Sequence, residues 1–140
     1  MKKHLLMLAL ASTCFMATQA GAMTKDEYKA AKEKVEADYK SAKAQCDAMK
    51  DNAKDVCQKE AKGTENVAKA ELEQQYKPSD AHARKLAEEK VKATYEVAKE
   101  KCDDQSGDAK AACVKQAKAD EAQGKADIKA MKKTKTKTAM

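Results

Sequence analysis

The chain has 140 residues, of which 37% are Asp, Glu, Lys or Arg and 4% are aromatic, with only four glycines. So few glycines exclude a glycine-rich phosphate-binding loop, and so few large apolar side chains exclude an extensive conventional core. The formal net charge of +6 lies at the two ends, because residues 23–128 hold 22 basic and 23 acidic side chains while residues 129–140 hold five lysines and no acid.

Residues 1–22 are predicted to be a secretory signal peptide. Two lysines near the start precede an apolar run over residues 5–17, which is too short to span a bilayer and is followed by small residues. Cleavage after Ala20 or after Ala22 fits the preference for small residues before the cleaved bond. A lipoprotein site at Cys14 is the alternative, but the residues around it fit that signal less well.

The chain that follows this leader contains one segment twice. A shift of 56 residues aligns residues 29–74 with residues 85–130, and 20 of the 46 aligned positions are identical. The matches include a valine, a tyrosine and both cysteines of each half, which a richness in alanine and lysine does not explain. The predicted domains are therefore two repeats, at residues 23–77 and 78–131, followed by a disordered Lys/Thr tail at residues 132–140.

The first repeat is predicted to form a helix, a short turn and a second helix. Thr24 and Glu27 stand at the spacing of a capping box, so the first helix begins directly after Thr24. Its apolar stripe continues to Cys46, after which residues 47–52 form a turn and Asn52 caps the second helix. The inward stripe of the second helix is expected at steps of three and four, at Cys57, Ala61, Thr64, Ala68 and Leu72.

The second repeat follows the same plan. Pro78 ends the second helix, and Ser79 or Asp80 caps the third. Residues 103–108 supply the next turn, and Asp108 caps the fourth helix.

Four cysteines remain once the leader is removed, and this even number favours two disulfides in an oxidising compartment. On one continuous helix, Cys46 and Cys57 would stand about 16 Å apart, so each could pair only across the repeat or with another chain. A turn between them brings them together instead. The favoured pairs are Cys46 with Cys57 and Cys102 with Cys113. Each closes a short loop and is worth about 3 kcal/mol.

The predicted fold class is therefore all-α. Two disulfide-stapled helical hairpins, derived from an internal duplication, form either a four-helix bundle or an elongated pair. The sequence leaves the choice between these two arrangements open.

No residue that could act in catalysis or metal binding has partners at the sequence spacing that such sites need. His82 is the single histidine after the leader and has no ligand residues at metal-binding spacing, and the cysteines lack the close pairs of zinc sites. No haem-attachment, phosphate-binding or nucleophile motif occurs. We therefore predict no catalytic residue, no metal site and no cofactor, and a protein that is not an enzyme.

The tail offers one candidate binding site, a contact to polyanions. Its plainer interpretation is a solubilising end, but five lysines that follow a nearly neutral body also suit electrostatic attachment to anionic lipid or cell-wall polymer. Nucleic acid is a poor match because export and a neutral body do not suit it. The lysines concerned are Lys129, Lys132, Lys133, Lys135 and Lys137.

Three motifs occur together in this chain: the start Met23-Thr24-Lys25-x-Glu27-Tyr28, the duplicated C-x10-C, and the joint Tyr76-Lys77-Pro78-Ser79. This set resembles a group of small exported Ala/Lys-rich proteins of Gram-negative bacteria, loosely called TolA-like. The resemblance covers the chain from Met23 to about Ala130. It implies a periplasmic setting and no mechanism.

Two functions fit these observations. The first is a non-enzymatic structural or interaction protein, periplasmic or secreted in a Gram-negative bacterium, whose hairpins present charged faces to an envelope protein and whose role includes protection under envelope stress. The second is a binding module that attaches to anionic lipid or cell-wall polymers through the tail. The specific partner and the oligomeric state stay open.

Overall fold

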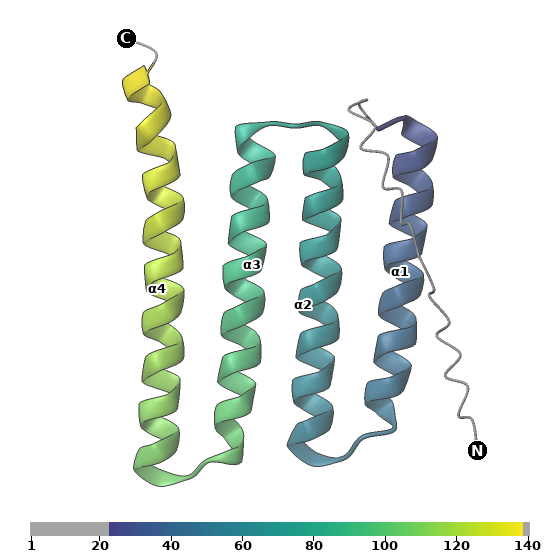
Figure 1. Ribbon diagram of the computed structural model, residues 1–140. Helices are drawn as coiled ribbons and strands as arrows, with labels where there is room; N and C mark the ends of the chain where they lie inside the picture. Colours follow the sequence, from purple (N-terminus) through teal and green to yellow (C-terminus); the bar gives the residue numbers. More distant parts are fainter. Residues whose placement is uncertain (1–22, 139–140) are drawn as a thin grey trace, which may run out of the picture.

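A computed structural model of the protein describes residues 23–138, with side chains described up to residue 132. The described part contains four long α-helices and one short 3-10 helix (Figure 1). Their bounds are α1 Lys25–Asp47, α2 Asp51–Tyr76, α3 Asp80–Lys101, η1 Cys102–Asp104 and α4 Gly107–Thr138. The prediction of an all-α fold made of two helical hairpins is confirmed. The predicted leader at residues 1–22, with its cleavage sites and Cys14, lies outside the described residues.

The four helices lie side by side in one layer and alternate in direction (Figure 1). Every extensive contact between the described helices joins neighbours in the chain: α1 with α2, α2 with α3, and α3 with α4. The α2–α3 interface is the most extensive of the three, so the two hairpins pack along their lengths and not end to end. The result is an open four-helix bundle, with α1 and α4 at its two edges.

The predicted start of the first helix is confirmed in detail. The Thr24 hydroxyl accepts a hydrogen bond from the backbone N–H of Glu27 at 3.2 Å, and the Glu27 carboxylate accepts one from the backbone N–H of Thr24 at 2.7 Å. The backbone hydrogen bond from Thr24 lowers the pKa of Glu27, because it favours the charged carboxylate. Helix α3 starts after Ser79, whose hydroxyl accepts a hydrogen bond from the backbone N–H of His82 at 3.1 Å.

The predicted caps of the other two helices are wrong. Helix α2 begins at Asp51 and helix α4 at Gly107, so Asn52 and Asp108 lie inside the first turns. Asp51 and Gly107 occupy the same repeat position, and both have a left-handed backbone, with φ of 50° and 56°. Each helix begins one residue earlier than predicted because the carbonyls of Lys50 and Ser106 accept hydrogen bonds from the backbone N–H groups of Lys54 and Lys110, at 3.3 and 3.4 Å. Asn52 instead donates a side-chain hydrogen bond to the backbone carbonyl of Glu100 at 3.1 Å and so joins α2 to α3.

Helix α4 continues past the boundary that the sequence suggested for the second repeat. That boundary was expected at residue 131, followed by disorder, but the helical backbone runs to Thr138. Neither glycine nor proline occurs between residues 125 and 138. Each added residue therefore extends an existing helix at little cost, because propagation is easier than nucleation. Residues 139 and 140 lie outside the described part of the chain.

Two disulfides and a few small side chains make up most of the buried interior. The Cys46–Cys57 and Cys102–Cys113 bonds join Cα atoms 5.4 and 5.6 Å apart, which confirms the predicted pairing. Cys46 and Cys102 are completely buried, and the other buried residues of the described chain are Ala61, Gly63, Glu65, Ala70, Leu72, Ala117 and Ile128. Each disulfide is worth about 3 kcal/mol, a large share of the roughly 5–15 kcal/mol typical of a whole domain.

Helices α2 and α3 approach closely at Gly63. A Cβ atom at this position would lie 2.8 Å from the Cβ of Ala93 and 3.5 Å from its Cα. Atoms of neighbouring helices do not pack that closely, so only glycine fits without a shift of one helix. This contact sets the spacing of the central interface, on which the candidate site depends.

Candidate interaction face

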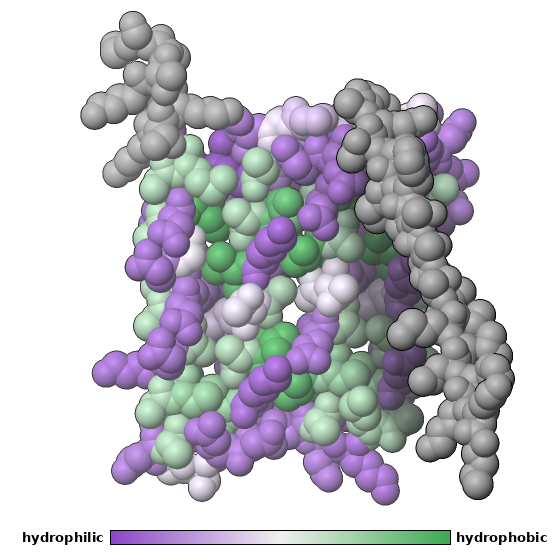
Figure 2. All heavy atoms as spheres, viewed as in Figure 1, coloured by the Kyte–Doolittle hydropathy of each residue, from purple (hydrophilic) through white to green (hydrophobic). Residues whose placement is uncertain are grey.

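Helices α2 and α3 form a shallow groove of about 770 Å³ on one side of the layer. Its middle is lined by six small side chains, which we call the open face: Thr64, Val67, Ala68, Thr94, Val97 and Ala98. Figure 2 shows apolar and neutral side chains along the middle of these helices, crossed by a few charged side chains. Thr64 and Thr94 are exposed, so this surface contacts solvent and not another helix of the chain.

An ion pair closes each end of the open face. At one end the carboxylate of Glu60 on α2 lies 2.9 Å from the ammonium of Lys101 on α3. At the other end Glu71 and Lys90 stand 4.0 Å apart in the same arrangement. All four side chains are at least half exposed, so each pair contributes little to stability. Their arrangement is what matters for recognition: both acids lie on α2 and both bases lie on α3.

Two smaller grooves continue the open face toward the edges of the layer. One, of about 370 Å³, lies between α1 and α2 and includes Val35 and Tyr39. The other, of about 210 Å³, lies between α3 and α4 and includes Val91 and Tyr95, the repeat equivalents of those two residues. The first shares Thr64 and Ala68 with the central groove, and the second shares Thr94 and Ala98. All three grooves therefore belong to the same side of the layer.

The opposite side of the layer carries charged side chains. The ammonium of Lys59 lies 3.4 Å from the carboxylate of Glu96 across the α2–α3 interface. Glu65, near the α1–α2 interface, receives hydrogen bonds from Lys62 and Lys69, both at 2.7 Å. Burial raises the pKa of Glu65, but these hydrogen bonds and the two positive charges outweigh it, so the pKa lies below its usual value. This side thus carries ion pairs along its length, whereas the two ion pairs across the open face stand at its ends.

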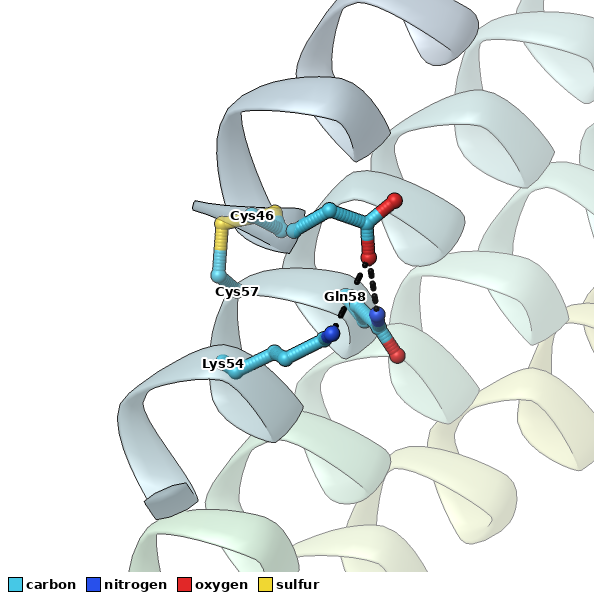
Figure 3. The surroundings of a disulfide bond; sticks show 5 residues. Cys46, Lys54, Cys57 and Gln58 are labelled. Carbon is cyan, nitrogen blue, oxygen red and sulfur yellow. Dashed lines mark hydrogen bonds and ion pairs between the residues drawn. A yellow bond between two sulfur atoms is a disulfide. The ribbon is translucent and has the colours of Figure 1, made fainter. Parts of the chain in front are cut away.

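The predicted disulfides stand at the turns between the helices of each hairpin. Cys46 is bonded to Cys57 beside a small polar cluster (Figure 3). In this cluster the carboxylate of Asp47 accepts a hydrogen bond from Gln58 at 3.0 Å and lies 3.4 Å from Lys54. The second repeat keeps the ion pair, as Asp103 and Lys110, at 2.9 Å. Both turns therefore share this ion pair and a disulfide that joins the two helices of the hairpin.

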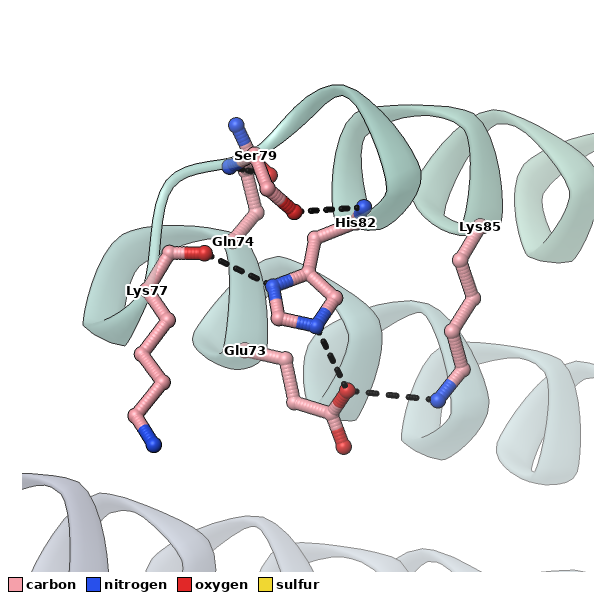
Figure 4. A network of polar contacts seen from close by, with 6 residues as sticks. All are labelled: Glu73, Gln74, Lys77, Ser79, His82 and Lys85. Carbon is pink, nitrogen blue, oxygen red and sulfur yellow. Dashed lines mark hydrogen bonds and ion pairs between the residues drawn. The ribbon is translucent and has the colours of Figure 1, made fainter.

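His82 belongs to the joint between the two hairpins (Figure 4). Its Nδ1 lies 2.7 Å from the backbone carbonyl of Lys77, and its Nε2 lies 3.9 Å from the carboxylate of Glu73. Lys85 contacts the same carboxylate at 3.2 Å. In the described part of the chain, no group of three or more His, Cys, Asp or Glu side chains is placed to hold a metal ion. These contacts link the end of α2 to the first turns of α3.

The structure describes part of the predicted polyanion contact. The side chains of Lys129 and Lys132 are exposed near the end of α4. The side chains of Lys133, Lys135 and Lys137 lie outside the described residues, although their backbone belongs to α4. None of the described helices has the length and apolar character needed to cross a membrane.

Sequence reasoning missed the open face, because it placed Thr64 on the buried stripe of the second helix. Ala61 and Leu72 of that stripe are buried, but Thr64 is exposed. The signal that could have found it is the threonine itself, a polar residue flanked by acids four residues before and seven residues after. A comparison of the chain with protein-family models, curated proteins and solved structures finds no match.

Proposed function

We propose that this protein is a non-enzymatic structural or interaction protein of an oxidising compartment outside the cytoplasm, the periplasm of a Gram-negative bacterium. It acts by presenting its open face to another protein. The single observation that carries this proposal is the one-layer architecture. A layer one helix thick leaves the small side chains around Thr64 and Thr94 uncovered, although such a surface is well suited to close packing.

The disulfides support the compartment. Cys46 and Cys102 are the two completely buried side chains of the described chain, and each is bonded within its hairpin. A chain with so small a core depends on these bonds, which persist in oxidising compartments and are reduced in the cytosol. The predicted leader agrees with this setting.

Photocrosslinking in intact cells tests the proposal. A photoreactive amino acid is placed at Thr94 on the open face, and at Lys92 as a control, which is exposed on the opposite side of the same helix. We expect covalent adducts to another protein chain from position 94 and few from position 92. Adducts from position 92 alone, or from neither position, contradict the proposal.

A second candidate function is attachment to anionic lipid or cell-wall polymer through the end of α4. One observation favours it: α4 extends beyond the ends of α2 and α3 (Figure 1). Lys129 and Lys132 are exposed on the last described part of α4 that leads to this extension. Basic side chains near an anionic surface contribute about 1 kcal/mol each, which suits weak and salt-sensitive attachment.

A further inference from the structure

We propose that the partner of the open face is a second copy of this chain. The inference rests on the proposed function, since it names what that face binds. Two layers would lie with their open faces in contact. A twofold axis would relate them, lying between the two layers, parallel to the helices and midway between α2 and α3. The resulting dimer is a sandwich of eight helices in two layers.

The charge pattern of the open face complements itself under this symmetry. A twofold axis parallel to the helices places α2 of one copy over α3 of the other and keeps each end of the layer at the same end. Glu60 then faces Lys101 of the second copy, and Glu71 faces Lys90 of the second copy. Each ion pair within a chain thus becomes a group of four alternating charges between chains, which favours association and fixes the register.

The other face-to-face twofold arrangement places like charges together. If the axis ran across the helices, α2 would lie over α2 of the second copy with its ends exchanged. Glu60 would then face Glu71 of the second copy, and Lys101 would face Lys90. Such juxtapositions disfavour association, so the charges select one of the two arrangements.

The chemistry of the open face suits contact between two helical layers. Its side chains are alanine, valine and threonine, which are short enough for helices of the two layers to approach closely. None of these six residues carries a charge, so no ion has to be buried unpaired. Within this central groove the charged residues stand at the two ends, where an interface rim is normally polar, and the flanking grooves include Asp38 and Asp120.

The size of the layer is sufficient for a stable dimer. With 26 residues in α2, the layer is about 39 Å long at roughly 1.5 Å per residue. Four helix axes about 9 Å apart make it about 27 Å wide between its edges. The face therefore covers about 1,000 Å² in projection, compared with about 800 Å² that a standard interface buries on each partner.

Sedimentation equilibrium tests the dimer. The full chain is expressed with its own leader and purified in its oxidised form, and we expect twice the mass of one chain. Thr64→Glu, at the centre of the open face, should raise the dimer dissociation constant at least about tenfold without loss of helix content by circular dichroism. Lys92→Glu, on the opposite side, is the matched control and should leave the dissociation constant unchanged.

A charge exchange tests the symmetry. Glu60→Lys and Lys101→Glu each place like charges opposite each other in the proposed dimer, so each variant alone should dimerise more weakly than the original chain. An equimolar mixture of the two variants pairs opposite charges at this end of the face, so it should form heterodimers about as tightly as the original chain. This recovery needs no change in the fold of either variant.

Three outcomes overturn the inference. A monomeric original chain excludes the dimer, and Thr64→Glu without effect excludes the open face. Stronger self-association of Glu60→Lys indicates the axis across the helices, where the introduced lysine would face Glu71 of the second copy. A monomer in solution that still forms photoadducts with a different protein from position 94 overturns the dimer alone and leaves the proposed function in place.

Discussion

Glu65 is the charged side chain that the described fold buries, and its environment explains why it stays ionised. Only 6% of its surface is exposed, and Lys62 and Lys69 each donate a hydrogen bond to a different carboxylate oxygen. The pKa of Glu65 is therefore lower in the folded chain than in the unfolded chain. Such a carboxylate stabilises the fold above its unfolded pKa, and this stabilisation is lost as the pH falls toward the folded pKa.

We expect Glu65→Gln to lower the free energy of unfolding at neutral pH by about 1–3 kcal/mol, because hydrogen bonds to a charged group are lost. In acid, where Glu65 itself is protonated, the difference between the variant and the original chain should narrow. Urea denaturation across a pH series measures both effects. The control is Glu121→Gln, at the equivalent position, where the side chain is 21% exposed and pairs with Lys125. A larger loss from Glu121→Gln would contradict the assignment.

A second feature at the level of single residues is the left-handed backbone of Asp51 and Gly107. Asp51 and Gly107 are repeat equivalents that differ in chemistry but share a positive φ. Glycine adopts this backbone without steric cost, and Asp and Asn tolerate it better than other residues with a side chain. The conformation therefore belongs to the turn that the two repeats share.

Gly107→Ala should lower the free energy of unfolding by about 1 kcal/mol, because the Cβ of alanine is crowded in the left-handed backbone. Gly107→Asn should lower it less. Thermal unfolding of the two oxidised variants, followed by far-ultraviolet circular dichroism, compares them directly. Equal stability of the two variants would mean that the turn changes its backbone to suit the residue.

At the scale of the elements, the sequence predicted what depends on neighbouring residues. The Thr24 capping box and the disulfide of each hairpin involve residues at most eleven positions apart, so their spacing alone restricts the geometry. The packing of hairpin on hairpin was left open because it depends on Gly63 and Ala93, thirty positions apart in a chain rich in small residues. The open face follows from that packing, and its signal in the sequence is limited to Thr64 and the acids that flank it.

The close contact of α2 with α3 can be tested by exchanging Gly63 and Ala93. Gly63→Ala should lower the free energy of unfolding by about 1 kcal/mol, since overpacking costs about 1–3 kcal/mol and the better helix propensity of alanine returns about 1 kcal/mol. The double variant Gly63→Ala with Ala93→Gly keeps one methyl group at the contact and should recover most of this loss. Urea denaturation of the original chain, the two single variants and the double variant measures it. An additive loss in the double variant would show that the two residues do not touch.

At the scale of the whole molecule, charge separates the layer from the tail. The layer balances its charges through pairs such as Lys59 with Glu96, whereas residues 129–140 hold five lysines and no acid. Any affinity for anionic surfaces should therefore belong to the end of α4. Attraction of this kind is screened within about 8 Å at physiological ionic strength.

A truncation that ends at Met131 removes four of these five lysines. We expect it to lose binding to phosphatidylglycerol vesicles in a co-sedimentation assay at low salt, with the fold of the layer unchanged. The full chain should bind and then release as salt rises. The control replaces Lys132, Lys133, Lys135 and Lys137 by Gln, which keeps the length of α4. Binding by the truncated chain would place the contact on the layer.

Both disulfides stand at the same end of the layer, at the α1–α2 and α3–α4 turns (Figure 1). The start of α1 and the end of α4 are therefore farthest from a covalent link, so they should open first. The two edges differ in what holds them there. Tyr28 on α1 stacks on Tyr76 with ring centroids 4.4 Å apart, whereas the position equivalent to Tyr28 in the second repeat is Arg84.

Amide protons should therefore exchange with solvent deuterium at rates that rise with distance from the disulfides and that differ between α1 and α4. Local opening is easiest where few buried contacts hold a helix. Exchange should quicken along α4 from Cys113 toward Thr138, while α1 should show slower exchange at its equivalent distance from Cys46. Mass spectrometry of the oxidised protein resolves this gradient, and Tyr28→Ala should make the two edges alike. The duplicated chain should therefore contain two hairpins of similar design and different lifetime, in which the far end of the second hairpin opens before that of the first.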